Sequence, residues 1–526
     1  MRRIRTLGLA ACAALALLAA VPAAAADIAI GRSNEPSALD PHFSRTGNNQ
    51  MTAQNIFDRL IDTDPNLQVR PALAESWTVV DPVTWEVKLR QGVTFHDGSP
   101  LTAEDVVYSI GRVSQIPNSP APFTGMVGAM AGVEIVDPTT LRFKTKVPTP
   151  TFIEQIGLIY IVSKKAAEGK KLEDFNAGTA AIGTGPYKFK EWVPGDRLVL
   201  ERNDAYWGEK PTHERVTFRF ITNDAARVAA LRSGSVDVID AVPPGDVPGL
   251  KRTAGINVYS IASGRLIYLA LDNSRDESPF VVGADGKPLK PNPLQDRRVR
   301  QAMSKMINRQ LIIDRVLEGS GEAAGQLAPP GIGGHDPALK PDAYDVDGAK
   351  ALLAEAGLKD GFGITVHSSN DRFPGDGDLA QALGQMFSRG GLKVNGVVTQ
   401  PYNVYAAAAT RRDFSAFVFS FGVTTPTSEI GLRNVLATYN KEAGSGAFNR
   451  VRYSNPAFDA ALGKASDEFD PEKRNALLAE ATRIAFEDVA LIPLYWQQVH
   501  WATRGGVTYV ANRNEDTIAA YAGGTK

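Results

Sequence analysis

Strand-like and helix-like segments alternate along the second half of the chain, and this order is what most constrains its fold. Helical periodicity predicts helices over residues 296–319, 345–358, 378–391 and 470–488. Strand-like runs lie between them at residues 363–368, 393–400 and 414–422. An alternation of this kind predicts an α/β sheet with helices packed against it.

The first 26 residues have the features of a secretory signal. Three arginines precede an apolar run over residues 7–21, and Ala24 and Ala26 are placed like an A-x-A cleavage site before Asp27. Cys12 lies in LAAC, which resembles a lipoprotein box, but the apolar run continues past it to the better cleavage site. We therefore predict a signal over residues 1–26 and an exported, unlipidated protein that begins near Asp27.

The composition of the chain argues against several kinds of bond and binding partner in the exported protein. Cys12 is the only cysteine, so the exported chain would have no disulfide and no thiolate metal site. No later apolar stretch approaches the roughly 20 residues that span a bilayer. Loss of the signal leaves 54 of the 57 basic residues against 58 acidic ones, which gives no reason to expect nucleic acid or an anionic membrane as partner. The length predicts roughly two or three domains.

The stretch VTFHDGSPLTAEDV places His96, Asp97 and Ser99 within four positions, and these are the side chains of a serine hydrolase. Known triads draw their members from well-separated positions, and one tight turn could hardly stack all three groups. The chain also lacks a G-x-S-x-G elbow. Asp97-Gly98 instead predicts a turn, and Thr102 predicts a helix N-cap. An exported hydrolase remains the distant alternative.

Two segments of the first half resemble each other. VVDPVTWEVKLR (79–90) and IVDPTTLRFKTK (135–146) each predict a strand, an Asp-Pro turn and a second strand. Recurrent hairpin chemistry explains so short a match more simply than an ancient duplication. Further along, the strand-like run 264–274 precedes a Gly/Pro/Lys-rich loop at 283–293, which predicts a domain boundary near residues 265–275.

The segment PALAESWTVVDPVTWEVKLRQGVTFHDGSPLTAEDVVYSIGRV resembles the signature region of the extracellular solute-binding proteins of family 5, the dipeptide, oligopeptide and nickel receptors of ABC importers. EPSALDPHFS, GTGPYKF, RNDAYWG, AARVAALRSGSVDVID, DRRVRQAMSKMINR, RYSNPAFDA and LIPLY are similar to further landmarks of this family, in family order. The landmarks run from about residue 28 to 510. Each is degenerate, and their order makes the resemblance specific.

The resemblance implies a two-lobed α/β periplasmic-binding-protein fold of type II, with an extra sub-domain inserted in the first lobe. Lobe I would comprise residues 27–68, 183–265 and 490–526, the inserted sub-domain residues 69–182, and lobe II residues 266–489. The ligand would lie between lobes that close by a hinge motion. The protein would then be a monomeric periplasmic receptor that delivers a peptide or peptide-like solute to ABC permease and ATPase subunits.

The resemblance also suggests how lobe II grips the solute. Arg372, in an "R-aromatic" loop after a strand, matches the arginine that holds the peptide carboxylate, and its planar fork suits that task. The alternative is a surface arginine paired with Asp371 or Asp376. Where dipeptide receptors carry an acid for the α-amine, this chain has Thr424 and Thr425, with Glu429 the nearest carboxylate.

A threonine pair cannot offset a buried ammonium. We therefore expect a carboxylate-bearing solute whose amine is absent, blocked or exposed to solvent. Further ligand contacts are expected from aromatic and polar side chains that the resemblance places near the cleft, with core packing as the alternative for the aromatic ones. These candidates are Tyr402, Tyr405, Tyr495, Trp496, Thr46 and Asn48.

Metal binding is a separate alternative, because the family includes nickel receptors. The six histidines are spread along the chain, and no two lie within one helical turn in sequence. We therefore predict no protein-held metal and no cofactor. An opine, a glycoside or a metal chelate remains an alternative solute.

Overall fold

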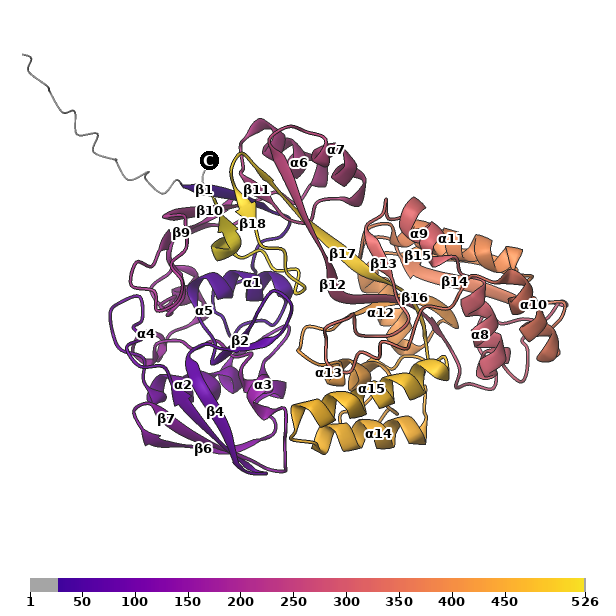
Figure 1. Ribbon diagram of the computed structural model, residues 1–526, viewed down its shortest axis with the longest axis horizontal. Helices are drawn as coiled ribbons and strands as arrows, with labels where there is room; N and C mark the ends of the chain where they lie inside the picture. The colour runs from indigo at the N-terminus through magenta and orange to yellow at the C-terminus, as the bar shows by residue number, and fades with distance from the viewer. Residues whose placement is uncertain (1–26, 525–526) are drawn as a thin grey trace, which may run out of the picture.

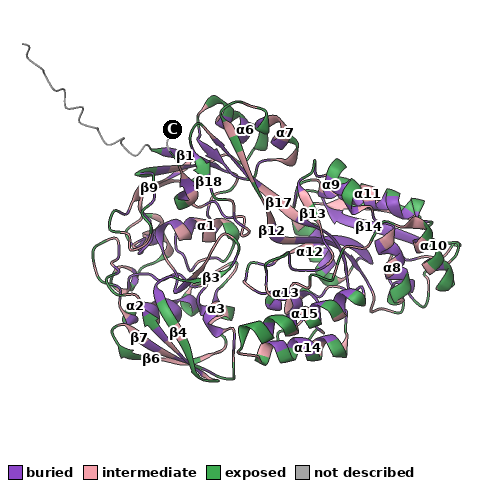
Figure 2. Cartoon of the chain, in the orientation of Figure 1, coloured by how far each residue is buried: buried purple, intermediate pink, exposed green. Residues whose placement is uncertain are grey.

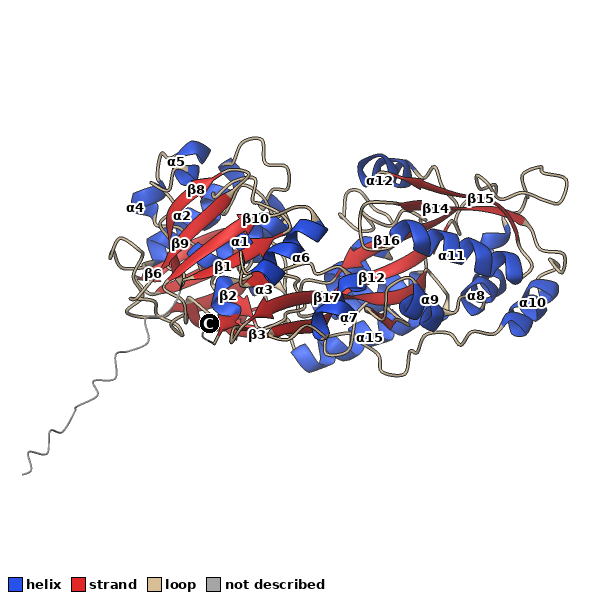
Figure 3. Ribbon diagram, turned by 90° about the horizontal axis from the view of Figure 1, so that it is seen from above, coloured by secondary structure: helices blue, strands red, loops and turns tan. Residues whose placement is uncertain are grey.

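The computed structural model describes residues 27–524, which form two lobes connected by two long strands, β12 (Ile256–Leu271) and β17 (Ile492–Arg504) (Figure 1). The two strands pair antiparallel, and Figure 3 shows them running from one lobe into the other. They belong to one 11-stranded sheet that continues through both lobes. The predicted signal over residues 1–26, with Cys12, lies outside the described residues.

Lobe I is built on the part of this sheet beyond the crossing strands, in the order β17-β11-β1-β10-β9-β8. Its elements are β1 (Ile28–Arg32), α1 (Gly47–Ile56), β2 (Ile61–Thr63), β3 (Val69–Pro71), β8 (Tyr187–Val193), β9 (Arg197–Arg202), β10 (Arg215–Phe220), α6 (Asp224–Ser233), β11 (Val238–Ile239), α7 (Val247–Lys251), β18 (Thr508–Tyr509) and β19 (Ala522–Gly523). The C-terminal segment therefore returns to the lobe in which the chain begins.

A sub-domain with its own four-stranded sheet and its own apolar core lies beside lobe I. Its elements are β4 (Ala74–Asp81), β5 (Thr84–Leu89), α2 (Ala103–Arg112), β6 (Met130–Asp137), β7 (Thr140–Thr145) and α3 (Phe152–Ile156). The short helices α4 (Lys164–Ala167) and α5 (Leu172–Asn176) follow, and their residues Ala167 and Phe175 are buried in the core of lobe I. Thr102 precedes α2 as predicted, and its backbone N–H and its hydroxyl both donate to Asp105 Oδ2, at 2.9 and 3.0 Å.

The two similar hairpins of the sequence, β4–β5 and β6–β7, are the halves of this small sheet and have matching irregularities. The pairing of β4 with β5 shifts register at Ala74/Ser76 and Val79/Asp81, and that of β6 with β7 shifts at Met130/Gly132 and Ile135/Asp137. Each position in the second hairpin lies 56 residues after its counterpart. The similarity therefore extends from turn chemistry to the bulges.

Lobe II surrounds the other end of the large sheet, in the order β15-β14-β16-β12. Its elements are α8 (Arg297–Lys305), α9 (Arg309–Arg315), β13 (Gly321–Ala323), α10 (Val346–Glu355), β14 (Gly363–Ser369), α11 (Asp376–Arg389), β15 (Lys393–Gln400), α12 (Tyr402–Arg411), β16 (Ala416–Gly422), α13 (Glu429–Val435), α14 (Pro456–Asp467) and α15 (Pro471–Glu487). The predicted strands and most predicted helices are present.

One predicted helix is wrong as a single element. The chain over residues 296–319 forms two helices, α8 and α9, because Asn308 interrupts the run and its side chain accepts a hydrogen bond from the Leu311 N–H. Asparagine competes for backbone donors in this way at helix N-caps. The apolar periodicity continues through the break, and so does not reveal it.

The inner strands of the lobe II sheet, β12, β14 and β16, are largely buried on both faces there, whereas the edge strand β15 is not (Figure 2). Successive residues of β12 point to opposite sides: Leu266 and Tyr268 pack into one core, Ile267 and Leu269 into another. The cores of lobe I and the sub-domain draw their buried residues from positions 28–250 and 501–522. The packing thus changes from one lobe to the other within the two crossing strands.

Leu67, in the loop between β2 and β3 of lobe I, is buried in the core of lobe II, and Gln68 Nε2 donates to Gly331 O at 2.9 Å. This loop is a third connection between the lobes, beside the crossing strands. No helix within residues 27–524 has the length and hydropathy needed to cross a bilayer.

Candidate functional site

A cleft of about 880 Å³ lies between the lobes. Its volume is in the range of small-molecule sites in proteins. Its walls come from three sources: residues of lobe I and the sub-domain between 33 and 59, between 224 and 244, at 514–516 and at Phe123 and Leu158; residues 370–376 and Thr424 of lobe II; and Arg265 and residues 497–501 of the crossing strands. Segments far apart in the sequence therefore meet in this one cleft.

Arg372 is exposed on the lobe II wall of the cleft. The loop is held by Asp376, whose Oδ2 accepts from the Arg372 backbone N–H at 3.0 Å. The guanidinium carbon lies 5.1 Å from the centre of the Tyr402 ring, in cation–π contact. Within residues 27–524 the guanidinium makes no ion pair, so it is not paired with Asp371 or Asp376.

The segment that follows β16 places its three candidate side chains differently. Thr424 is exposed on the cleft wall, whereas Thr425 lines a small adjoining pocket and donates to Thr427 O at 2.8 Å. Glu429 is buried at the start of α13, where Oε1 accepts from Arg433 Nη2 at 2.5 Å and from Ser466 Oγ at 3.0 Å. Glu429 does not line the cleft, and Arg433 already pairs with its carboxylate.

Of the four aromatic candidates, one contacts Arg372 and the other three are buried in the cores of lobe II. Tyr402 begins α12, is half-buried, and contacts Arg372 and the lobe II core. Tyr405 is 1% exposed within that core, and its hydroxyl donates to Val418 O. Trp496 is 4% exposed and donates to Leu327 O at 3.1 Å, and Tyr495 is buried in the other lobe II core. None of these four is among the residues that line the cleft.

Thr46 and Asn48 lie beside the cleft, but their side chains are used locally. Thr46 Oγ1 bonds Ser44 and Asn49, and Asn48 Nδ2 donates to Glu35 O at 2.6 Å. Their neighbour Arg45 lines the cleft and is exposed there. Desolvation by the surrounding walls lowers the pKa of Arg45.

Sequence reasoning missed most of the polar groups of the cleft. Four wall residues carry a buried polar atom that has no partner within residues 27–524: Gln54 Oε1, Gln497 Oε1, Asn514 Oδ1 and His500 Nε2. A buried polar group without a partner costs about 1–3 kcal/mol, so these atoms are available to a bound molecule. No local pattern marks them, because glutamine, asparagine and isolated histidine are common on ordinary surfaces.

Asp516 is a further missed residue. It lines the cleft on the lobe I side, and no donor within the described chain bonds its carboxyl group. Burial raises the pKa of Asp516 to about 7, against the attraction of Arg59, which lowers it. The group is therefore poised between a neutral acid and a carboxylate near neutral pH.

The three side chains of the hydrolase alternative do not form a proton relay. Ser99 Oγ donates to Asp97 Oδ1 at 2.5 Å, whereas His96 bonds the backbone of lobe I through Gly185 O at 3.0 Å and the Gly183 N–H at 3.3 Å. Burial lowers the pKa of His96 to about 4. The stretch forms a turn and leads into α2, as predicted.

No group of three or more metal-ligating side chains is assembled within residues 27–524. His42, for example, is buried, with its ring nitrogens bonded to Tyr160 O at 2.7 Å and to Arg112 at 3.0 Å.

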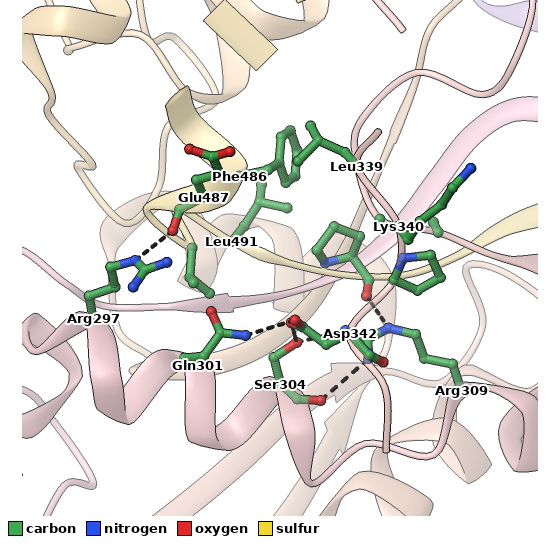
Figure 4. Close-up of a pocket in the computed structure, with 15 residues that line it drawn as sticks. Arg297, Gln301, Ser304, Arg309, Leu339, Lys340, Asp342, Phe486, Glu487 and Leu491 are labelled. Atoms are coloured by element: carbon green, nitrogen blue, oxygen red, sulfur yellow. Dashed lines mark hydrogen bonds between the residues drawn. The ribbon is translucent and has the colours of Figure 1, made fainter. Parts of the chain in front are cut away.

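A second cavity, of about 230 Å³, lies in lobe II between α8 and the end of α15 (Figure 4). Its polar groups already bind one another: Gln301 and Ser304 donate to Asp342, and Arg309 donates to Asp342 O at 3.2 Å. The cleft differs in offering polar groups that the protein leaves without partners. The cleft is therefore the stronger candidate site.

Comparison with known proteins fits this geometry. The profile of the bacterial extracellular solute-binding proteins, family 5 Middle, matches residues 68–443. The chain belongs to this family. The matched residues include the sub-domain and most of lobe II, and therefore contribute to both sides of the cleft.

Among curated relatives, the family 5 chain is 26% identical to the glutathione-binding protein GsiB of Salmonella paratyphi A over 487 residues, which are 91% of this chain and 90% of the relative. Among solved structures, HbpA2 from Haemophilus parasuis is similar with a TM-score of 0.81 and 24% identity, covering 95% of this chain and 100% of that one. DppA from Helicobacter pylori, in complex with the peptide STSA, is similar with a TM-score of 0.73 and 23% identity, covering 95% and 98%.

These likenesses confirm the predicted fold, the two-lobed type II periplasmic-binding-protein fold. They concern the course of the backbone. The ligand of this family 5 protein must be argued from its own side chains.

Proposed function

We propose that this protein is the periplasmic receptor of an ABC importer and captures a peptide-like, carboxylate-bearing solute by lobe closure. Family membership supports the receptor role. The similarity to a glutathione-binding protein and to a receptor solved with a bound peptide supports a peptide-like solute. A ligand can drive closure only through contacts that it gains in the closed state, and the cleft lies where such contacts would form.

The observation that carries the proposal is the unpaired guanidinium of Arg372 on the cleft wall. Arginine binds a carboxylate through two parallel charge-assisted hydrogen bonds. Tyr402 lies against the guanidinium and restricts it, which lowers the entropy lost on binding. No protein carboxylate competes for Arg372 within the described residues.

In the segment after β16, where an acid for the α-amine would be expected, the candidate groups are neutral or already paired. Thr424 faces the cleft and Glu429 pairs with Arg433. We therefore retain the inference that the segment after β16 does not bind a free α-amine of the solute. Asp371 of lobe II and Asp516 of lobe I are cleft carboxyl groups that make no ion pair within the described residues, and an amine could use either instead.

The delivery steps follow from the receptor role. The protein would be exported by its N-terminal signal, act as a monomer, and hand the solute to permease and ATPase subunits. It would not transform the solute, because Ser99 donates to Asp97 and His96 bonds lobe I backbone groups, so His96 cannot activate Ser99. Purified protein and Ser99→Ala should show the same background with esterase and peptidase substrates.

The solute can be identified by native mass spectrometry of the purified protein, followed by thermal-shift screening of peptides, opines, glycosides and metal chelates. A solute at about 100 times its Kd adds roughly 2.7 kcal/mol of stability, which a melting scan detects. Calorimetry with that solute should then show a loss of about 1.5–3 kcal/mol in Arg372→Ala. A loss below about 1 kcal/mol would remove Arg372 from the site.

A further inference from the structure

Five arginines line the cleft, and three of them are already engaged by carboxylates. Arg59 pairs with Asp62, Arg227 with Asp224 at 2.7 Å, and Arg265 with Glu515 at 3.1 Å. The other two, Arg45 and Arg372, make no ion pair and no side-chain hydrogen bond within residues 27–524. These two charges are therefore free to bind an anion.

The two free arginines lie on different lobes. Arg45 precedes α1 in lobe I, where its backbone N–H donates to Ala121 O at 2.9 Å and fixes the start of the side chain. Arg372 lies in the loop between β14 and α11 of lobe II. Both side chains are exposed, and both line the same cleft.

No carboxyl group of the cleft forms an ion pair with Arg45 or Arg372 among residues 27–524, and most accept hydrogen bonds from other groups. Asp240 accepts from the Ser33 N–H at 2.7 Å and the Thr517 hydroxyl at 3.1 Å, and Asp376 accepts from Ser369 at 2.7 Å. Asp371 accepts from the Tyr402 N–H at 2.7 Å. Asp516 has no donor among the described residues.

A cation that makes no ion pair and lies in a concave, partly desolvated site attracts an anion more strongly than a cation in bulk water does. We propose that the solute carries two anionic groups, and that Arg45 of lobe I binds the second while Arg372 of lobe II binds the first. This inference rests on the proposed function, because it adds a second anchor to the site that Arg372 defines.

The placement of the two anchors gives the second one a specific role. A solute with a single anionic group, bound by Arg372, leaves Arg45 without a partner when the cleft closes. A second anionic group brings Arg45 into contact in the closed state, so its binding energy is realised on closure. Arg45 therefore selects for solutes with two anionic ends.

Matched probes separate the two anchors. The probes are alanine peptides of one to three residues, each made with an N-terminal succinyl group, which adds a second carboxylate, and with an N-terminal acetyl group, which does not. Calorimetry would compare them on wild type, Arg45→Gln, Arg45→Lys, Arg372→Gln and Arg252→Gln. Arg252 is exposed and does not line the cleft, so its variant controls for the loss of one positive charge.

In wild type, at least one succinyl peptide should bind tenfold or more tightly than its acetyl counterpart. Arg45→Gln should reduce this preference to threefold or less, Arg45→Lys should retain part of it, and Arg372→Gln should weaken both probes. Arg252→Gln should match wild type, and melting temperatures would verify folding of every variant. Acetyl peptides that bind through Arg372 as tightly as succinyl peptides would overturn the role of Arg45 and leave the proposed function standing. If neither probe series binds, both proposals fail.

Discussion

Arg474 of α15 in lobe II donates a hydrogen bond to Glu154 of α3 in the sub-domain, with Nη2 and Oε1 3.2 Å apart. Figure 1 shows the two helices facing each other at the edge where the sub-domain meets lobe II. Trp85 and Phe469 meet across the same boundary, with ring centres 6.3 Å apart. The sub-domain and lobe II are thus joined by a polar and an aromatic contact, in addition to the connection through the crossing strands.

The folded protein should lose stability as the pH rises, because Glu154 then becomes a buried carboxylate. Burial raises the pKa of Glu154 to about 7, although Arg474 lowers it, and the charge of Glu429 raises it further. In the unfolded chain the pKa of a glutamate is about 4.5. Between about pH 4.5 and 7 the folded protein therefore holds a proton that the unfolded chain has lost, and the free energy of unfolding falls across that range. Glu154→Gln should flatten the fall in melting temperature between pH 5 and 8.

Glu134→Gln is the matched control for this prediction, because Glu134 is an exposed sub-domain glutamate. Its melting profile should follow that of wild type. Equal slopes in wild type and Glu154→Gln would contradict the assignment.

Tyr402 should matter for binding through Arg372. Tyr402→Ala removes the ring beside the guanidinium, and a cation–π contact at an exposed site contributes about 0.5–1 kcal/mol. We expect the affinity for a carboxylate-bearing solute to fall about two- to fivefold. Tyr402→Phe keeps the ring and should bind like wild type in calorimetry. An equal loss in both variants would show that the hydroxyl acts instead.

Trp496 should matter for stability, because it is buried in the core of lobe II and away from the cleft wall. Trp496→Ala leaves a cavity and loses the hydrogen bond to Leu327, at an expected cost of about 3–5 kcal/mol in the free energy of unfolding. Urea denaturation would measure this cost. A variant with unchanged stability and lost solute binding would return Trp496 to the list of ligand contacts.

Gly264 should be intolerant of a side chain. It lies in the irregular part of β12, between Ala262, which pairs with β17, and Arg265, which pairs with β16. A methyl group there would lie 2.0 Å from Val423 O, so the backbone would have to shift. Overpacking of this kind costs about 1–3 kcal/mol, and Gly264→Ala should melt at a lower temperature.

A glycine with free space around it provides the comparison. Gly463 lies on the exposed side of α14, and a methyl group there would contact nothing within 4 Å. Gly463→Ala should raise the melting temperature, because alanine favours helix by about 0.5–1 kcal/mol. Similar destabilisation by both substitutions would mean that the contact at Gly264 is not responsible.

Local structure was largely predictable from the sequence. Asp470 caps α15 and Pro471 begins it, as the sequence predicts, because caps depend on neighbouring residues alone. The burial of Tyr405 was also accessible: Tyr405, Ala408 and Ala409 have the spacing of one helical face, and all three are buried. A tyrosine in a segment near the cleft is not thereby a ligand contact.

The cleft itself was only partly predictable. Arg372 and Thr424 were found through resemblance, and both line the cleft. Arg45, Gln497 and Asp516 were missed, because they come from three distant segments whose meeting depends on the return of the chain to lobe I. No local pattern in the sequence encodes that meeting.

The paired crossing strands also have an evolutionary consequence. The chain enters lobe II along β12 and leaves it along β17, and at the lobe II end Leu269 is the pairing partner of Ile492. Neighbouring strands lie about 4.8 Å apart, so the ends of everything between these two residues almost touch. Apart from the docked Leu67 loop and the contacts of Arg474 and Phe469 with the sub-domain, the second lobe is therefore one continuous segment of the gene. Recombination could exchange this segment for another lobe through two junctions that lie close together in the protein.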